Sequence, residues 1–227
     1  LRSSGTRVVA YNFDSFGYNP APLRWYKDVD RYATFDYADA EKYGLPRVDL
    51  FSSLPEVAGP KEIRYDVSAI LRNHSDRLEY LDSILRALEP QRTFLFVFEQ
   101  NVFTFVLNIL RSPRLYAKYW RHISFKPLPY SQYAAVLRSS EYTVDYAHPR
   151  QTGITIRCFE SLSAQTKVIT NNAFVTRNPA FADAMPIIYR DSRDDECLRQ
   201  QCATGRRKLP PRRHRSITEF ISELVDT

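Results

Sequence analysis

Short apolar segments alternate with segments of helical periodicity over most of the chain. The run "TFLFVF" (Thr93–Phe98) is apolar at nearly every position, as in parallel strands that are buried on both faces. Just before it, four leucines between residues 78 and 88 recur at helical spacing. This alternation predicts an α/β fold, with a parallel sheet and helices on both of its faces. Because such sheets bind ligands beyond the carboxyl ends of their strands, we expect the turns after "VSAIL", "ISFKP" and "YTVDYAHP" to line one crevice.

One stretch interrupts this regular pattern and predicts a domain boundary. "SSLPEVAGPKE" (Ser52–Glu62) lacks apolar periodicity and holds two prolines and a glycine. We therefore expect residues 1–55 to be the closing part of a preceding α/β domain. Residues 56–227 would form the main domain, including a basic segment and the amphipathic terminal helix "SITEFISELV".

Composition limits the class of protein. The 227 residues carry a net charge of +6, and the apolar runs are too short and too interrupted to span a membrane. No signal peptide opens the chain, so we expect a cytoplasmic protein. Cys158, Cys197 and Cys202 match no common zinc pattern and are expected to be reduced structural thiols. The only methionine is Met185 and the chain begins at Leu1, which predicts a piece of a longer protein.

The basic charge is concentrated in "GRRKLPPRRHRS" (residues 205–216). This segment is either a solvated, proline-rich connector or a dock for an anionic partner. That partner would be acidic lipid headgroups at the inner face of a membrane or nucleic acid, and nucleic acid is the less expected of the two.

The stretch "PRQTGITIRCFESLSAQTKVITNN" (Pro149–Asn172) carries the main chemical signal. We expect a helix over Thr152–Ala164, on which Gly153, Arg157 and Glu160 share one stripe. The free N–H groups at its start would bind a diphosphate, and Glu160 further along would accept hydrogen bonds from ribose hydroxyls. The alternative is an ordinary helix start followed by a surface ion pair.

A longer run resembles a known family. "YTVDYAHPRQTGITIRCFESLSAQTKVITNN" is similar to the nucleotide-sugar-binding segment of GT-B glycosyltransferases, in particular bacterial surface-polysaccharide transferases. "RYDVSAILRNHSDRLEYL" resembles the first strand and phosphate-facing loop of their C-terminal domain, and "ISFKPLPYSQYAAVLRSSEYTVD" resembles the unit that closes over the base. "YNFDSF" and "ATFDYADAEKYGLPRVDLF" look like the end of their acceptor domain. The loop "LRNHSDR" lacks a glycine that relatives commonly have.

The resemblance implies a Rossmann-like domain, the C-terminal half of a GT-B fold, that binds a nucleotide-sugar and transfers the sugar to a glycan or lipid-linked acceptor. It implies that Glu160 binds the ribose, that the Thr152 and Gly153 amides bind the diphosphate, and that Arg157 neutralises charge or braces the helix. The full set of expected nucleotide-sugar contacts is Gln151, Thr152, Gly153, Arg157, Glu160, Arg72, Arg77, Lys126, Tyr130, Asp145 and His148.

Other interpretations of single residues stay open. Arg77 could be an ordinary first-turn helix residue, Lys126 a loop lysine, Tyr130 a packing residue and His148 a strand-end residue. His74 is more typical of a solvated loop histidine than of an acid or base, and strand-end Asp14 is either a polar site residue or the cap of a turn.

The expected reaction needs no cofactor. A helix N-terminus and arginines can stabilise a leaving diphosphate without a metal, and the sequence has no paired-carboxylate metal motif. A catalytic base would come from the acceptor domain, most of which this chain lacks, so we expect the chain alone to be weakly active or inactive. Two alternatives are a nucleotide-sugar epimerase of the same fold and a noncatalytic module that binds anionic lipid or nucleic acid through its basic tail.

Overall fold

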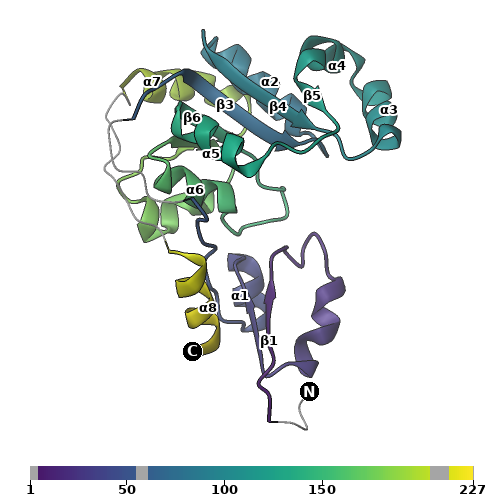
Figure 1. The fold of residues 1–227 in the computed structure, drawn as a ribbon, viewed down its shortest axis with the longest axis vertical. Coiled ribbons are helices and arrows are strands. Elements are labelled where there is room, and N and C mark those ends of the chain that lie inside the picture. Colours follow the sequence, from purple (N-terminus) through teal and green to yellow (C-terminus); the bar gives the residue numbers. More distant parts are fainter. Residues whose placement is uncertain (1–4, 55–60, 205–214, 227) are drawn as a thin grey trace.

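The computed structural model describes residues 5–54, 61–204 and 215–226. These residues form a large unit built on a six-stranded sheet and a smaller unit that contains the first and the last of the described segments (Figure 1). The expected boundary near residue 55 and most of the basic segment 205–216 lie outside the described residues.

All strand pairs of the large sheet are parallel, and the strand order is β5-β4-β3-β6-β7-β8. Counted along the chain within this unit, the order is 3-2-1-4-5-6, which is that of doubly wound Rossmann folds. The prediction of a Rossmann-like parallel sheet is therefore confirmed. The strands are β3 (Tyr65–Arg72), β4 (Thr93–Phe98), β5 (Ile123–Ser124), β6 (Ser140–Asp145), β7 (Lys167–Thr170) and β8 (Ile187–Ile188).

Helices cover both faces of this sheet. On one face α2, α4 and α7 share a core with residues of β3, β4 and β6, including the fully buried Leu81 and Ile84. On the other face α5 contacts β3 and β6, and α6 contacts β6 and β7. The helices of this unit are α2 (Arg77–Leu88), α3 (Val102–Arg111), α4 (Pro113–Tyr119), α5 (Tyr130–Arg138), α6 (Ile156–Ser163) and α7 (Asp195–Thr204), with 3-10 turns at Trp120–His122, Ala173–Arg177, Pro179–Phe181 and Ser192–Asp194.

The smaller unit pairs β1 (Val9–Asn12) with β2 (Arg31–Thr34) in parallel, with a 3-10 helix (Ala21–Asp28) between them. After β2 comes α1 (Tyr37–Tyr43), which begins at the N-cap Asp36 and ends at Gly44, whose φ of 64° is in the left-handed region that favours glycine. A single bridge from Thr34 to Arg47 extends the sheet.

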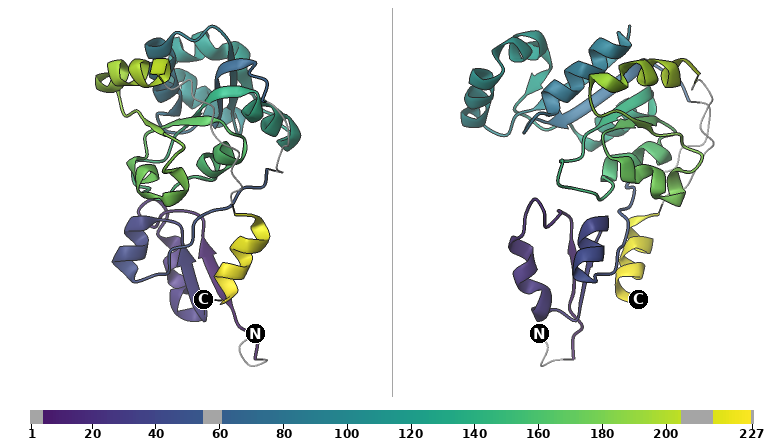
Figure 2. Two further views of the ribbon diagram at one scale, coloured as in Figure 1. Left: turned by 90° about the vertical axis from the view of Figure 1, so that its left-hand side faces the viewer. Right: turned by 180° about the vertical axis from the view of Figure 1, so that it is seen from behind.

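The terminal helix α8 (Ile217–Asp226) does not belong with the large sheet, where we expected it. Phe220 and Leu224 pack in one cluster with Ala33 and Val48 of the smaller unit, and Figures 1 and 2 show α8 beside β1. The chain thus returns to the smaller unit at its end. An amphipathic pattern shows that a helix has a face to bury, but not which neighbour buries it.

Candidate functional site

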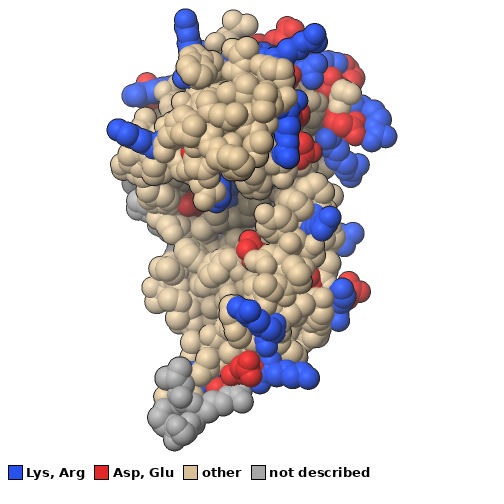
Figure 3. Space-filling model, turned by 90° about the vertical axis from the view of Figure 1, so that its right-hand side faces the viewer, with Lys and Arg blue, Asp and Glu red and all other residues tan. Residues whose placement is uncertain are grey.

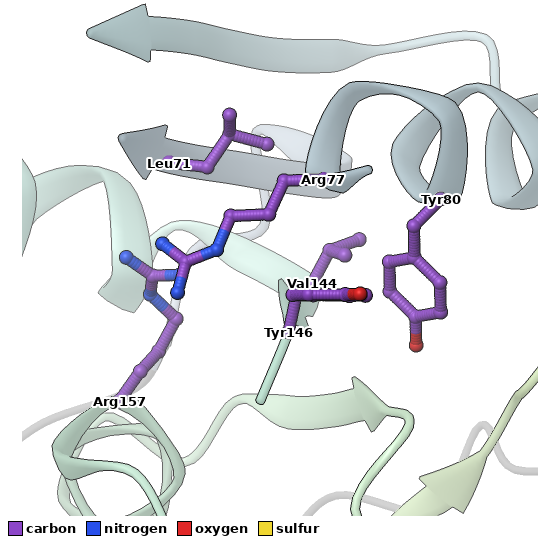
Figure 4. A pocket seen from close by; sticks show the side chains of 6 residues that line it. All are labelled: Leu71, Arg77, Tyr80, Val144, Tyr146 and Arg157. Carbon is purple, nitrogen blue, oxygen red and sulfur yellow. The ribbon is translucent and has the colours of Figure 1, made fainter. Parts of the chain in front are cut away.

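A small pocket opens where the strand order reverses, beyond the carboxyl ends of β3 and β6. Its lining residues are Leu71, Arg77, Tyr80, Val144, Tyr146 and Arg157, and its volume is about 230 Å³ including the open mouth. In Figure 4 the guanidinium groups of Arg77, from α2, and Arg157, from α6, point toward each other across it. This is the position at which doubly wound folds bind their ligands. The structure therefore brings together two of the sequence-predicted cations.

The two arginines differ in how well their charges are balanced. Burial, and then the like charge of Arg157, lowers the pKa of Arg77, which is also the first residue of a helix, where the positive end of the helix dipole disfavours a cation. The pKa of Arg157 is raised although burial opposes its charge, because Tyr133, Asp145 and Glu160 lie near it. The Nε atoms of both arginines are buried, and neither has a hydrogen-bond partner in the described part of the chain.

Further cationic or titratable groups surround this pocket. Burial, followed by the charges of Arg77, Arg72 and His148, lowers the pKa of His74 to about 4. Burial and the charges of Arg150 and Arg77 lower the pKa of His148 as well. Neighbouring positive charges thus contribute to both shifts, and Asp76 opposes them. The Arg72 side chain donates to the Gln100 side chain and lies near enough to Arg77 to affect its pKa.

The Glu160 carboxylate, which lies near Arg157, accepts hydrogen bonds from two tyrosines of α5. The Tyr130 hydroxyl donates to Glu160 Oε1 at 2.9 Å, and the Tyr133 hydroxyl donates to Oε2 at 2.5 Å. Glu160 is only 4% exposed, so it does not present an open carboxylate as we had expected. Burial is the main cause that raises the pKa of Tyr133, and the charge of Glu160 raises it further. The Tyr133 hydroxyl therefore stays protonated and can donate to Glu160. Tyr133 lies three residues after Tyr130, on the same helix face, but the sequence interpretation did not single it out.

The Gln-Thr-Gly segment is not the start of the helix. Helix α6 begins at Ile156 with Thr155 as its N-cap, and the preceding residues form a loop, so Gly153 shares no helical stripe with Arg157 and Glu160. In that loop Gln151 donates to the Gly153 carbonyl at 3.1 Å.

The amides that we expected to bind a diphosphate donate to Asp36 of the smaller unit instead. Asp36 accepts from the Thr152 amide at 2.7 Å, the Gly153 amide at 2.9 Å and the Thr152 hydroxyl at 2.6 Å, as well as from the Asp39 amide at 3.1 Å as the N-cap of α1. Asp36 is fully buried. The arrangement is an internal anion site that the protein's own carboxylate fills. We call residues 151–153 with Asp36 the interdomain clasp.

Close packing explains the glycine in this clasp. A Cβ on Gly153 would lie 2.4 Å from two ring carbons of Phe35, a buried residue next to Asp36. The side-chain amide of Asn172 also donates to the Gly153 carbonyl at 2.9 Å. Gly153 therefore permits contact between the two units.

The remaining candidates do not line the pocket. The buried Asp145 carboxylate accepts from the Thr155 hydroxyl at 2.7 Å and the Thr170 hydroxyl at 2.9 Å, so it ties α6 to β7. Lys126 is exposed in the loop after β5. Asp14 is exposed in a turn and accepts weakly from Asn19 at 3.4 Å.

Residues 5–54, 61–204 and 215–226 contain neither a candidate metal site nor a candidate membrane-spanning helix. No group of three or more His, Cys, Asp or Glu side chains in these ranges is placed to hold a metal ion. None of the helices there is long and apolar enough to cross a membrane.

Solved structures with a similar fold include three proteins. TarM matches with a TM-score of 0.53 at 10% identity, over 95% of this chain and 47% of its own. AviGT4, a glycosyltransferase involved in avilamycin A biosynthesis, gives a TM-score of 0.49 at 13% identity, over 79% of this chain and 54% of its own. The GtfA/B complex gives 0.43 at 10% identity, over 83% of this chain and 40% of its own.

The likeness to TarM, together with the strand order, shows the fold. This chain spans about half the length of the structures it matches. No protein-family model matches the sequence, and no curated protein matches it either.

Proposed function

We propose that this chain is the donor-binding part of a glycosyltransferase, and that the pocket between Arg77 and Arg157 binds the diphosphate of a nucleotide-sugar. The observation that carries the proposal is the pair of opposed guanidinium groups at the point where the strand order reverses (Figure 4). Two like charges in a partly buried pocket repel each other unless an anion lies between them. Planar guanidinium groups bind phosphate oxygens in bidentate fashion, and the leaving diphosphate of a sugar transfer needs such stabilisation.

The enclosed part of the pocket has room for about one water-sized group. A phosphate would therefore reach the guanidinium groups from the open mouth of the pocket, and most of the ligand would lie outside it. The nucleoside would therefore extend toward the tyrosine-capped Glu160. For Glu160 to bind ribose, the Tyr130 hydroxyl must give way or the carboxylate must use its remaining lone pairs, because a carboxylate has about four acceptor positions. Tyr130 is half exposed and is the more easily displaced of the two tyrosines.

The proposal also includes the acceptor substrate, which receives the sugar. Transfer to a glycan or lipid-linked acceptor in surface-polysaccharide synthesis rests on the sequence resemblance alone. A hydroxyl acceptor would bind between the two units, where Figure 3 shows the molecule narrowing to a hollow. The Tyr18 ring of the smaller unit lies 4.5 Å from the His148 ring of the large unit.

Calorimetric titration with UDP-, GDP-, CMP- and dTDP-sugars and with inorganic pyrophosphate tests this proposal. Arg77→Gln and Arg157→Gln should each weaken binding of the preferred ligand by about 1.5–3 kcal/mol, as expected when a charged hydrogen bond is lost. Arg199→Gln is the matched control, because Arg199 forms only an exposed pair with Glu196 on α7. Binding that both pocket variants retain in full would refute a diphosphate site here.

A further inference from the structure

Helix α3 turns a broad apolar face to the surface. Seven of its ten residues are apolar, and Thr104, Asn108 and Arg111 form one narrow polar stripe. Phe105 and Ile109 face inward and pack against the core of the large unit, while Phe103 and Leu110 on the outer side are 73% and 74% exposed. The apolar face of a helix is normally buried inside a protein or against a membrane. The outer face of α3 therefore lacks a partner in the described part of the chain.

Aromatic side chains extend this face beyond the helix. The Phe105 ring lies 5.2 Å from the Phe125 ring and 6.5 Å from the Trp120 ring, measured between centroids. Trp120 is 64% exposed, and Phe125 is also exposed. We call the exposed residues Val102, Phe103, Val106, Leu107, Leu110, Trp120 and Phe125 the α3 patch. In Figure 3, which views the molecule from the side of α3 and α4, a broad uncharged area covers the upper part, with Lys and Arg side chains, and some Asp and Glu side chains, along its border.

The charged residues of the segment that carries the α3 patch have one sign, although Glu79 of α2 reaches this segment by accepting a hydrogen bond from the Ser112 hydroxyl at 2.7 Å. Between Gln100 and Ser140 the sequence contains no Asp or Glu. The same segment contains Arg111, Arg114, Lys118, Arg121, Lys126 and Arg138. Of these, Lys118 is paired with Asp82 at 2.7 Å, whereas Arg111, Arg114, Arg121 and Lys126 are exposed.

We propose that the α3 patch docks the protein on the surface of an anionic phospholipid bilayer. Exposed aliphatic and aromatic side chains would enter the boundary between headgroups and acyl chains, with Trp120 at headgroup level, while the four exposed cations would contact lipid phosphates. A second copy of the chain fits less well, because pairing two such patches face to face would bring cations of the same segment together. The patch lies at the β5 edge of the sheet, away from the smaller unit, so docking would leave the hollow between the units open (Figures 1 and 3).

Flotation of the full chain with vesicles tests this docking without any nucleotide. The vesicles are an equal mixture of phosphatidylglycerol and phosphatidylcholine, compared with phosphatidylcholine alone, at about 100 mM salt. The double variant Phe103→Ser, Leu110→Ser should lower partitioning into the anionic vesicles about tenfold or more. The triple variant Arg111→Gln, Arg114→Gln, Arg121→Gln should lower it roughly a hundredfold, because each cation near an anionic surface contributes about a fivefold effect.

Matched controls separate the patch from general loss of apolar or basic surface. Ile217→Ser, Ile221→Ser removes two exposed apolar side chains from α8, and Lys42→Gln, Arg190→Gln, Arg199→Gln removes three exposed cations elsewhere. Every variant keeps residues 205–216, so lipid binding by that segment alone would leave all of them equal and would overturn the proposal. Retained binding of nucleotide or pyrophosphate by the patch variants would show that docking and donor binding fail separately.

Docking of a second copy of the chain on the α3 patch is tested with the same protein samples. Sedimentation velocity should show the wild type and the Phe103→Ser, Leu110→Ser variant with the same mass across the concentrations used. A concentration-dependent dimer that this variant loses would identify the α3 patch as a contact between two copies and would overturn the membrane proposal.

Discussion

The interdomain clasp and the arginine pocket both follow the carboxyl end of β6, yet their polar groups are satisfied very differently. In the clasp, Asp36 is fully buried and accepts four hydrogen bonds. In the pocket, two guanidinium groups face each other, and their buried Nε atoms have no hydrogen-bond partner among the residues that the structure describes. Buried polar groups are normally hydrogen-bonded, so the exceptions call for an explanation. The contrast supports a structural role for the clasp and the proposed anion site in the pocket.

The largest effect is expected when the clasp loses its carboxylate. Asp36→Ala leaves the Thr152 and Gly153 amides and the Thr152 hydroxyl without their acceptor, and each unsatisfied buried donor costs about 1–3 kcal/mol. We expect the free energy of unfolding, measured by urea denaturation, to fall by about 3 kcal/mol or more. Asp14→Ala is the control, because Asp14 is exposed and weakly bonded.

The same variant tests the division between clasp and pocket. If the clasp amides are purely structural, pyrophosphate should stabilise Asp36→Ala and the wild type by the same amount. A much larger gain for Asp36→Ala would mean that the amides bind an anion once Asp36 is removed, as the sequence first suggested.

Gly153→Ala probes the packing of the clasp. The added Cβ would approach the Phe35 ring to 2.4 Å, and Phe35 is too deeply buried to move freely. Overpacking of this kind costs about 1–3 kcal/mol in the free energy of unfolding. The smaller side chain in Phe35→Leu should recover part of this loss in the double variant. Additive losses in denaturation experiments would argue against direct contact.

The pocket should respond in the opposite direction to the clasp. Arg77→Met removes a charge that burial, Arg157 and the helix dipole all disfavour, and replaces it with an apolar side chain of similar length. It also removes a contact with the Tyr146 ring, 5.7 Å from the guanidinium carbon. We expect a net gain of about 1 kcal/mol in ligand-free stability, together with loss of pyrophosphate binding. Arg199→Met should change neither quantity, and a destabilised Arg77→Met that still binds pyrophosphate would reverse the assignment.

The sequence predicted the parts of this molecule that depend on local pattern. Alternating apolar and helical segments indicated the parallel sheet, and the positions of Arg77 and Arg157 indicated cations at its carboxyl edge. The contact between Asp36 and the Thr152 amide spans 116 residues, and no local pattern reports it. The "DYAD" segment is typical of a helix start with Asp36 as the N-cap. A carboxylate can accept more hydrogen bonds than capping uses, and the sequence does not show which other groups donate to it.

Two interpretations failed for related reasons. The helix was expected from Thr152 because Gly153, Arg157 and Glu160 fit helical spacing, whereas Gly153 lies in a loop tied to the other unit. Glu160 was expected to face a ligand because it fits one helical stripe with Gly153 and Arg157, whereas it is buried and the Tyr130 and Tyr133 hydroxyls make its burial tolerable. In both cases a tertiary partner decides the environment of the residue.

The smallest expected effect is the pH response of the pocket, which also reports whether an anion occupies it. The folded-state pKa of His74 is about 4, below the ordinary value of 6.5, because burial and the charges of Arg77, Arg72 and His148 disfavour its protonated form, with Asp76 acting in the opposite direction. Between pH 6.5 and 4 the unfolded chain therefore binds a proton that the folded protein does not, so stability falls as the pH falls through this window. Because His74 is half exposed, screening should keep the loss below about 1 kcal/mol. His74→Gln should flatten the dependence of unfolding free energy on pH, while His148→Gln should leave most of this dependence in place.

Pyrophosphate between the arginines would offset their charge and raise the pKa of His74, which NMR titration of the ring proton can follow. A His74 pKa that stays the same with saturating pyrophosphate would place the bound anion away from Arg77, and the contrast between clasp and pocket would lose its functional meaning.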